Sequence, residues 1–212
     1  MLEEDKYTEF CLMFRLLHSS RFRVSGDEAC VFENWFNMSI ASGNRIRDGL
    51  SDAVKTAMEI IGKAAVRGRG LGNEALRQAY DNHELTTNQF NKELIHFIYR
   101  ILFLFIIEER QLVYQIPDSS SEEYRRLCRL QDIYKKYYAV SRFRSQSELY
   151  YLQDRRYNDL WQSLMDTFRL FESSGYGDAL GIKPLGGVLF DDDTLHYLKD
   201  CSIDNEQFLQ AF

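Results

Sequence analysis

Proline is nearly absent from this sequence of 212 residues, which contains only Pro117 and Pro184. Proline interrupts a helix because it lacks a backbone N–H and clashes with the preceding turn. Its scarcity therefore favours long helices. The two prolines are far apart in the sequence, so the chain contains no Pro-Pro dipeptide.

Cysteine is also scarce, and its four residues are widely separated. They are Cys11, Cys30, Cys128 and Cys201. No CxxC pair occurs, which argues against a zinc site, and the spacing does not suggest a small disulfide framework. We expect reduced thiols, most of them buried.

Segments for targeting or for crossing a membrane are missing from the sequence. Acidic residues precede the first apolar positions and Arg15 lies among them, unlike the apolar core of a signal peptide. The most apolar stretch, Ile101 to Ile107, lies between Arg100 and Glu108, whereas a membrane span takes about 20 apolar residues. We therefore expect a cytoplasmic protein with no membrane contact.

Motifs of common catalytic sites are missing as well. The glycines of Arg67 to Asn73 (RGRGLGN) have the spacing GxGxG after a predicted helix, whereas a dinucleotide site needs GxGxxG after a strand. The four histidines are isolated, and Asp191 to Asp193 lack the spacing of a calcium loop,. Negative charge at the start of a helix explains these carboxylates better. We expect no catalytic residue, metal or cofactor in this chain.

The most prominent feature present is a long apolar segment from Thr86 to Arg110. Thr86 and Gln89 have the spacing of a capping box at a helix start, and the apolar residues that follow recur at helical intervals. The segment is apolar on every side over Ile101 to Ile107, so we expect other helices to surround it. The predicted fold is mostly α, a multi-helix domain packed round a central apolar helix, 86–110.

Apolar periodicity predicts helices before this central one. The first covers Glu4 to Ser19, and a second, long helix ends at Val66 with a break near Gly43,. Asn73 is expected to cap a short helix that ends at Tyr80.

After the central helix, the sequence predicts further helices and a glycine-rich loop near 175–190, with a short extended piece at Val188 to Phe190. Asp193 or Thr194 is expected to cap a helix that ends at Cys201. A last helix, Asn205 to Phe212, has an apolar face with no continuation in the sequence.

Charge is unevenly distributed along this acidic chain, whose net charge is −6. Arg125 to Arg156 contains nine basic and three acidic residues, so its net charge is +6 and that of the remainder is −12. The segment also contains several tyrosines. Basic side chains neutralise phosphates, and tyrosines add hydroxyl contacts or stacking. The alternative is an ordinary solvated helix surface with half-buried tyrosines.

Five segments carry a resemblance to a known family. They are RIRDGLSDAVKTAMEIIG (Arg45 to Gly62), FNKELIHFIYRILFLFIIEER (Phe90 to Arg110), VSRFR (Val140 to Arg144), DLWQSLMDTFRLF (Asp159 to Phe171) and LGIKPLGGVLF (Leu180 to Phe190). In this order they resemble the helical region that precedes the methyltransferase domain in large, Eco57I-like adenine-specific DNA methyltransferases. These are type IIG restriction-modification enzymes and related methylases of phage-defence systems.

The resemblance implies a connector that contains none of the family's catalytic motifs. The family binds S-adenosylmethionine through a glycine-rich motif after a strand and grips the flipped base with [ND]PP[YF], and neither motif occurs here,. No PD-(D/E)xK nuclease pattern occurs either. On this interpretation, 1–24 is an N-terminal helix that belongs to this domain or to a preceding one, and 25–204 is the connector. Residues 205–212 begin a helix that leads into a missing methyltransferase domain.

The predicted function is therefore a non-catalytic scaffold that positions such a domain, in cis or in trans, on double-stranded DNA. The expected phosphate contacts are Arg142, Arg144, Arg155, Arg156, Lys135, Lys136, Arg67 and Arg69,. S-adenosylmethionine is expected only in the missing domain. The alternative is a helical protein-interaction module that docks a partner chain or that domain. An enzyme in its own right would need an acid, base, nucleophile or metal set that the sequence does not supply.

Overall fold

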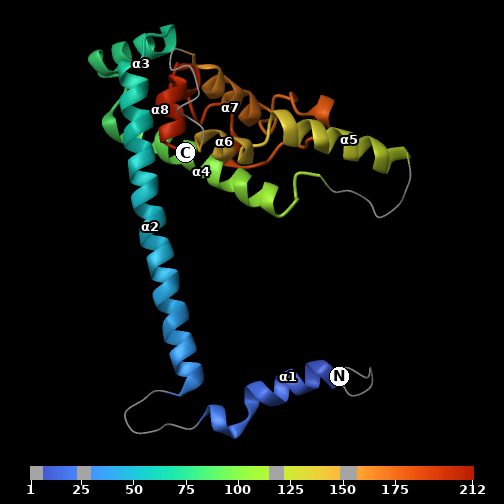
Figure 1. Ribbon diagram of the computed structural model, residues 1–212. Coiled ribbons are helices and arrows are strands. Elements are labelled where there is room, and N and C mark those ends of the chain that lie inside the picture. Colours follow the sequence, from blue (N-terminus) through green and yellow to red (C-terminus); the bar gives the residue numbers. More distant parts are fainter. Residues whose placement is uncertain (1–6, 23–29, 115–121, 149–156) are drawn as a thin grey trace. The chain divides into compact units, whose positions relative to one another are not determined.

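The computed structural model describes residues 7–22, 30–114, 122–148 and 157–212 (Figure 1). Helices and turns make up these residues, and no strand occurs among them, which confirms the predicted mostly α fold. The chain divides into two compact units, Met1–Ala53 and Val54–Phe212. The division falls inside the segment 25–204 that the sequence suggested as one connector domain.

The first unit contains α1 (Tyr7–Leu17), η1 (Ser19–Arg21) and the first part of α2 (Val31–Arg67). The predicted break near Gly43 is wrong, because α2 continues through that residue. A glycine costs a helix only about 1 kcal/mol relative to alanine. No residue described in this unit is buried.

The second unit contains the rest of α2, further α-helices and short 3-10 helices. They are α3 (Leu71–Asp81), α4 (Thr87–Glu109), α5 (Glu122–Tyr137), α6 (Ser141–Ser147), α7 (Asp159–Arg169), η3 (Asp178–Leu180), η4 (Val188–Phe190), η5 (Leu198–Asp200) and α8 (Asn205–Gln210). Every buried apolar residue of the described chain lies in this unit.

Helix α4 begins as the sequence predicts. The Thr86 hydroxyl accepts a hydrogen bond from the Gln89 backbone N–H at 3.3 Å, and the Gln89 side chain accepts one from the Thr86 N–H at 2.8 Å. In the middle of the helix, the Phe97 ring lies 5.1 Å from that of Trp161 and 5.9 Å from that of Phe168, both on α7. The core of the unit is therefore built on α4.

The expectation that neighbours surround α4 on every side is wrong. One face of the helix is buried, but four apolar side chains on the other face are exposed by 37% to 55%. They are Ile95, Tyr99, Phe103 and Ile106. Apolar residues remain common on protein surfaces because too little polar surface exists to cover the molecule, so an all-apolar stretch of sequence does not require complete enclosure.

The last helix packs inside the second unit. Phe208 and Leu209 of α8 are buried, and the Phe208 ring lies 5.2 Å from that of Phe143 on α6 and 6.1 Å from that of Trp161. Figure 1 shows α8 beside α6 and α7. The expectation of an uncovered apolar face on this helix is therefore wrong.

The segment between α7 and α8 consists of turns and short 3-10 helices. Val188–Phe190 is the 3-10 helix η4, where the sequence suggested an extended piece. The predicted helix from Asp193 or Thr194 to Cys201 is also wrong, because turns and η5 occupy that stretch. Leu195 and Leu198 are buried there. A short segment can bury two apolar side chains without forming a regular helix.

Candidate functional site

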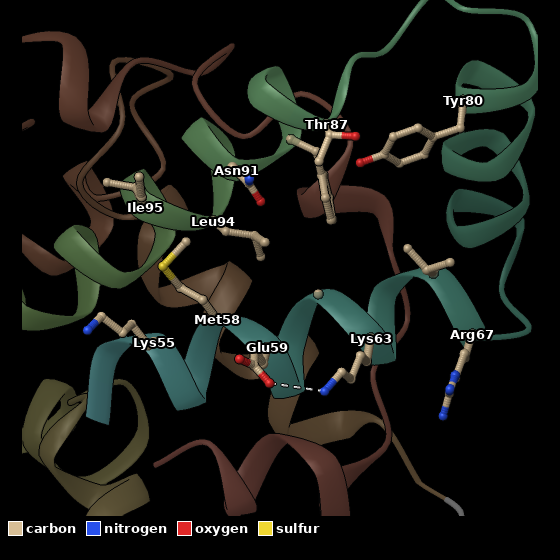
Figure 2. A pocket seen from close by; sticks show the side chains of 13 residues that line it. Lys55, Met58, Glu59, Lys63, Arg67, Tyr80, Thr87, Asn91, Leu94 and Ile95 are labelled. Carbon is tan, nitrogen blue, oxygen red and sulfur yellow. Dashed lines mark hydrogen bonds and ion pairs between the residues drawn. The ribbon is translucent and has the colours of Figure 1, made fainter. Parts of the chain in front are cut away.

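A groove opens on the second unit between α2, α3 and α4 (Figure 2). Its volume is about 570 Å³. Gly62 lies at its base, where an added Cβ would be 3.2 Å from the Leu94 side chain, so glycine allows α2 to approach α4 closely here,. The apolar lining consists of Met58, Val66, Tyr80, Phe90, Leu94 and Ile95.

Charged side chains follow α2 along one edge of this groove. Lys55, Glu59, Lys63 and Arg67 recur every four residues and therefore lie in one row,. Figure 2 shows the ion pair between Glu59 and Lys63, whose Oε2 and Nζ atoms are 3.1 Å apart. The other edge, on α4, contributes the uncharged Thr87 and Asn91. The groove is thus an apolar surface with one mainly basic edge.

The predicted phosphate contacts Arg67 and Arg69 are both exposed. They line a second cavity of about 560 Å³ together with Ser202, Asp204 and Gln207. The carboxylate of Asp204 would repel an anion placed between the two arginines. This cavity therefore offers only a mixed electrostatic environment.

Asn73 holds the glycine-containing turn in place from inside α3. Its side-chain oxygen accepts hydrogen bonds from Gly70 N–H at 3.1 Å and Ser202 N–H at 2.9 Å, and its amide donates to the Ala65 carbonyl at 2.7 Å. The residue that caps the helix is Gly70, so the prediction of Asn73 as the cap is wrong. Asn73 acts three residues later, where its fully buried side chain links the turn to the segment before α8.

Exposed basic side chains gather on α5 and α6. They are Arg125, Arg126, Arg129, Lys135, Lys136 and Arg144, which we term the α5–α6 basic surface. Arg125, Arg129 and Lys136 share the face of α5 opposite the buried Tyr134,. Two exposed carboxylates, Glu122 and Asp132, lie on the same face of α5,.

Arg142 has a different environment from its basic neighbours. It is partly buried, its guanidinium lies 4.6 Å from the centre of the Phe143 ring, and it donates a hydrogen bond to the Ser163 hydroxyl. Burial lowers the pKa of Arg142, although the nearby Glu108 carboxylate opposes that shift. A phosphate would have to replace these contacts, so Arg142 is a weaker candidate than Arg144.

Lys135 on α5 and Arg144 on α6 both line a cavity of about 350 Å³. Glu108 also lines it and accepts hydrogen bonds from the Tyr134 hydroxyl at 2.7 Å, Val140 N–H at 2.8 Å and Ser141 N–H at 2.9 Å. Burial, with the Glu108 charge, raises the pKa of Tyr134 above its ordinary value. These contacts fix α6 and therefore the position of Arg144.

Two of the predicted contacts, Arg155 and Arg156, lie outside the described residues. The structure thus brings Lys135 and Arg144 to one cavity and Arg67 and Arg69 to another.

The sequence did not predict the groove between α2, α3 and α4. The four-residue spacing of charges on α2 was visible in the sequence, but its apolar floor comes from three helices.

The buried ionisable groups of the second unit have structural partners. One oxygen of Glu93 accepts hydrogen bonds from the N–H groups of Tyr197 and Leu198, both at 3.0 Å. Burial raises the pKa of the Cys201 thiol to about 12, which disfavours the nucleophilic thiolate at neutral pH,. Of the four cysteines only Cys201 is buried, so the expectation of mostly buried thiols is wrong.

Neither a metal-binding cluster nor a membrane-spanning helix is found among the described residues. No group of three or more histidine, cysteine or acidic side chains in the described segments is arranged to hold a metal ion. None of the helices in that part of the chain has the length and apolar character needed to cross a membrane.

Comparison with protein-family models, curated proteins and solved structures finds no match to this chain. The resemblance to adenine-specific DNA methyltransferases therefore stays a prediction from the sequence. The class that the structure itself defines is a mostly α protein with a basic helical surface and an apolar groove.

Proposed function

We propose that the second unit is a non-catalytic helical module that positions a DNA-modifying domain on double-stranded DNA. The observation that carries this proposal is the α5–α6 basic surface, whose six cationic side chains are exposed although the chain as a whole is acidic. Cationic side chains attract duplex DNA because each phosphate contact releases condensed counterions.

The contacts proposed here are to phosphates and do not read bases. Arg125, Arg129 and Lys136 lie on one helix face over about 17 Å, given the helical rise of 1.5 Å per residue,. A row of this kind matches a sugar-phosphate backbone, and such contacts fix orientation without carrying sequence information. Sequence recognition and catalysis then belong to other domains.

The family resemblance supplies the rest of the proposal. A methyltransferase domain, in cis or in trans, would bind S-adenosylmethionine and the target adenine, and the helical module would hold that domain against the duplex. The protein would then act in the cytoplasm of a bacterium, where its DNA substrate lies.

The experiment is DNA binding by the full chain, measured as fluorescence anisotropy of a labelled duplex over a range of salt concentrations. We expect Arg125→Ala/Arg129→Ala/Lys136→Ala to weaken binding. The salt slope should fall by about 0.9 for each phosphate that the variant no longer neutralises. The matched control is Lys63→Ala/Lys92→Ala/Arg169→Ala, which removes three exposed charges of α2, α4 and α7, outside the α5–α6 basic surface.

Equal weakening of binding in both triple variants would show that only net charge matters. Unchanged affinity of the first variant at low salt would remove the proposal.

A second candidate function is the docking of a protein partner. The specific observation that favours it is the groove between α2, α3 and α4, whose apolar floor and basic edge suit the apolar face and acidic flank of a helix,. The partner would be the methyltransferase domain supplied in trans.

A further inference from the structure

The first unit exposes an unusual amount of apolar surface. Its described residues include none that is buried, and thirteen large apolar side chains are exposed by 39% to 75%. On α2 these are Trp35, Phe36, Met38, Ile40, Ile46 and Leu50. Extended apolar patches on soluble proteins mark interaction surfaces.

One face of α2 within this unit has a regular composition. Phe32, Phe36, Ser39, Gly43, Ile46 and Leu50 follow one another at intervals of four, three, four, three and four residues. This alternation keeps six side chains in one stripe along the helix. With 1.5 Å per residue, the stripe is about 27 Å long.

The stripe reads the same from either end. Two large residues are followed by two small ones and then by two large ones, and the centre of the series is level with Ala41. An antiparallel copy aligned on that centre places Phe36 opposite Ile46. It also places Leu50 opposite Phe32, which is half-buried because its ring packs 5.0 Å from that of Phe22. Ser39 then faces Gly43, where no atom of the chain lies within 4 Å of a Cβ added to the glycine. The face is therefore complementary to itself.

Charge selects the antiparallel orientation. Glu33 and Arg47 are exposed on the same flank of the stripe, and equivalent flanks of two antiparallel helices meet across a two-fold axis. In the alignment on Ala41, Glu33 of one copy and Arg47 of the other lie within one helical turn. A parallel pair would place Arg47 beside the flank that contains Ser42 and Gly49, which has no carboxylate.

We propose that the chain forms a two-fold symmetric homodimer in which the α2 segment from Phe32 to Leu50 packs antiparallel against the same segment of a second copy. The exposed ion pair that Arg47 makes with Asp48, at 3.4 Å, gives way to the pair with Glu33 of the other copy at little cost, because both partners are largely exposed,. This dimer does not depend on DNA binding.

The first test is the mass of the full chain in solution, measured by light scattering after size exclusion. We expect twice the 25.0 kDa of one chain. Phe36→Glu and Ile46→Glu place a charge inside the interface and should each yield the monomer mass. The matched control is Met38→Glu, which adds the same charge to an exposed apolar position of α2 outside the stripe,.

A wild-type chain of monomer mass at micromolar concentration would overturn the proposal. Dissociation by Met38→Glu to the same extent as by Ile46→Glu would also overturn it. Circular dichroism of each variant distinguishes dissociation from loss of helix.

The second test is the orientation of the two helices. Phe36→Cys and Ile46→Cys are made separately, in a chain whose partly exposed Cys11, Cys30 and Cys128 are replaced by serine. A mixture of the two variants should form an intermolecular disulfide, because these positions face each other in the antiparallel pair. Ile46→Cys alone should not, since its two copies would be about 15 Å apart along the helices. Efficient crosslinking of Ile46→Cys with itself would show a parallel pair and overturn the proposal.

Discussion

At the scale of single residues, Arg100 shows how a charged side chain can belong to a core. Its side chain is only 1% exposed. It donates hydrogen bonds to the Leu189 carbonyl at 2.7 Å, the Glu172 carboxylate at 2.6 Å and the Asp191 carbonyl at 2.8 Å. Burial lowers the pKa of the guanidinium, and the Glu172 carboxylate opposes that shift. Arg100 thus joins α4 to the segment around η4.

We predict that Arg100→Ala lowers the free energy of unfolding by about 3 to 5 kcal/mol, the usual range when one partner of a buried ion pair is removed. The carboxylate and two carbonyls would be left without their donor. Urea denaturation followed by circular dichroism measures this. The matched control is Arg169→Ala, whose ion pair with Asp166 is more than half exposed and should matter by less than about 1 kcal/mol,. Equal losses in the free energy of unfolding for the two variants would contradict the structural role assigned to Arg100.

The burial of single side chains also shows which basic residues are free to contact a phosphate, which the sequence alone does not. Arg142 and Arg144 are two positions apart on α6, yet one is packed on Phe143 and the other is exposed. A charge count cannot distinguish them, because both contribute one positive charge. Their difference arises from the direction in which each side chain leaves a short helix.

At the scale of elements, the groove depends on how α2, α3 and α4 pack. Val66 and Ile95 belong to different helices and are 38% and 37% exposed on its walls. Neither contributes to the buried core, so both can be changed without unfolding the unit.

We predict that Ile95→Glu abolishes retention of a purified Eco57I-like methyltransferase domain by the immobilised chain, since a charge would enter the apolar lining of the groove. Tyr99→Glu is the matched control, because Tyr99 is exposed on the same helix outside the groove lining. Pull-down followed by gel densitometry measures the retained domain. Retention by both variants, or failure of the wild type to retain the domain, would count against the second candidate function.

Close contacts between elements also explain why α3 begins where it does. A Cβ at Gly72 would lie 1.9 Å from the Asp200 carbonyl oxygen, so only glycine lets α3 approach η5,. Gly68 and Gly70 lie in the turn between α2 and α3, whereas Gly72 lies in the first turn of α3. Their packing partner, about 130 residues later in the chain, has no signature in the local sequence.

At the scale of the whole molecule, the buried residues that the structure describes are confined to one unit. Every buried apolar side chain of the described chain lies at Ala57 or later, in Val54–Phe212. The two units also differ in proposed role, since DNA binding is assigned to the second unit and dimer formation to the first.

We therefore predict that a fragment 54–212 folds by itself. Its thermal unfolding should stay cooperative, because it retains the whole hydrophobic core,. Light scattering should give a monomer mass for this fragment, even where the full chain is a dimer. Loss of cooperative unfolding in differential scanning calorimetry would show that the core needs the first unit, and a dimeric fragment would contradict the assignment of the dimer contact to α2.

The sequence by itself determined the helical class of this protein and the start of α4. These features depend on local causes, namely the scarcity of proline, the Thr86 capping box and apolar residues at helical spacing. The tertiary structure alone decided the exposed face of α4, the packing of Phe208, the roles of Asn73 and Arg142, and the groove. Each of these depends on contacts between residues distant in the chain, which local periodicity does not encode.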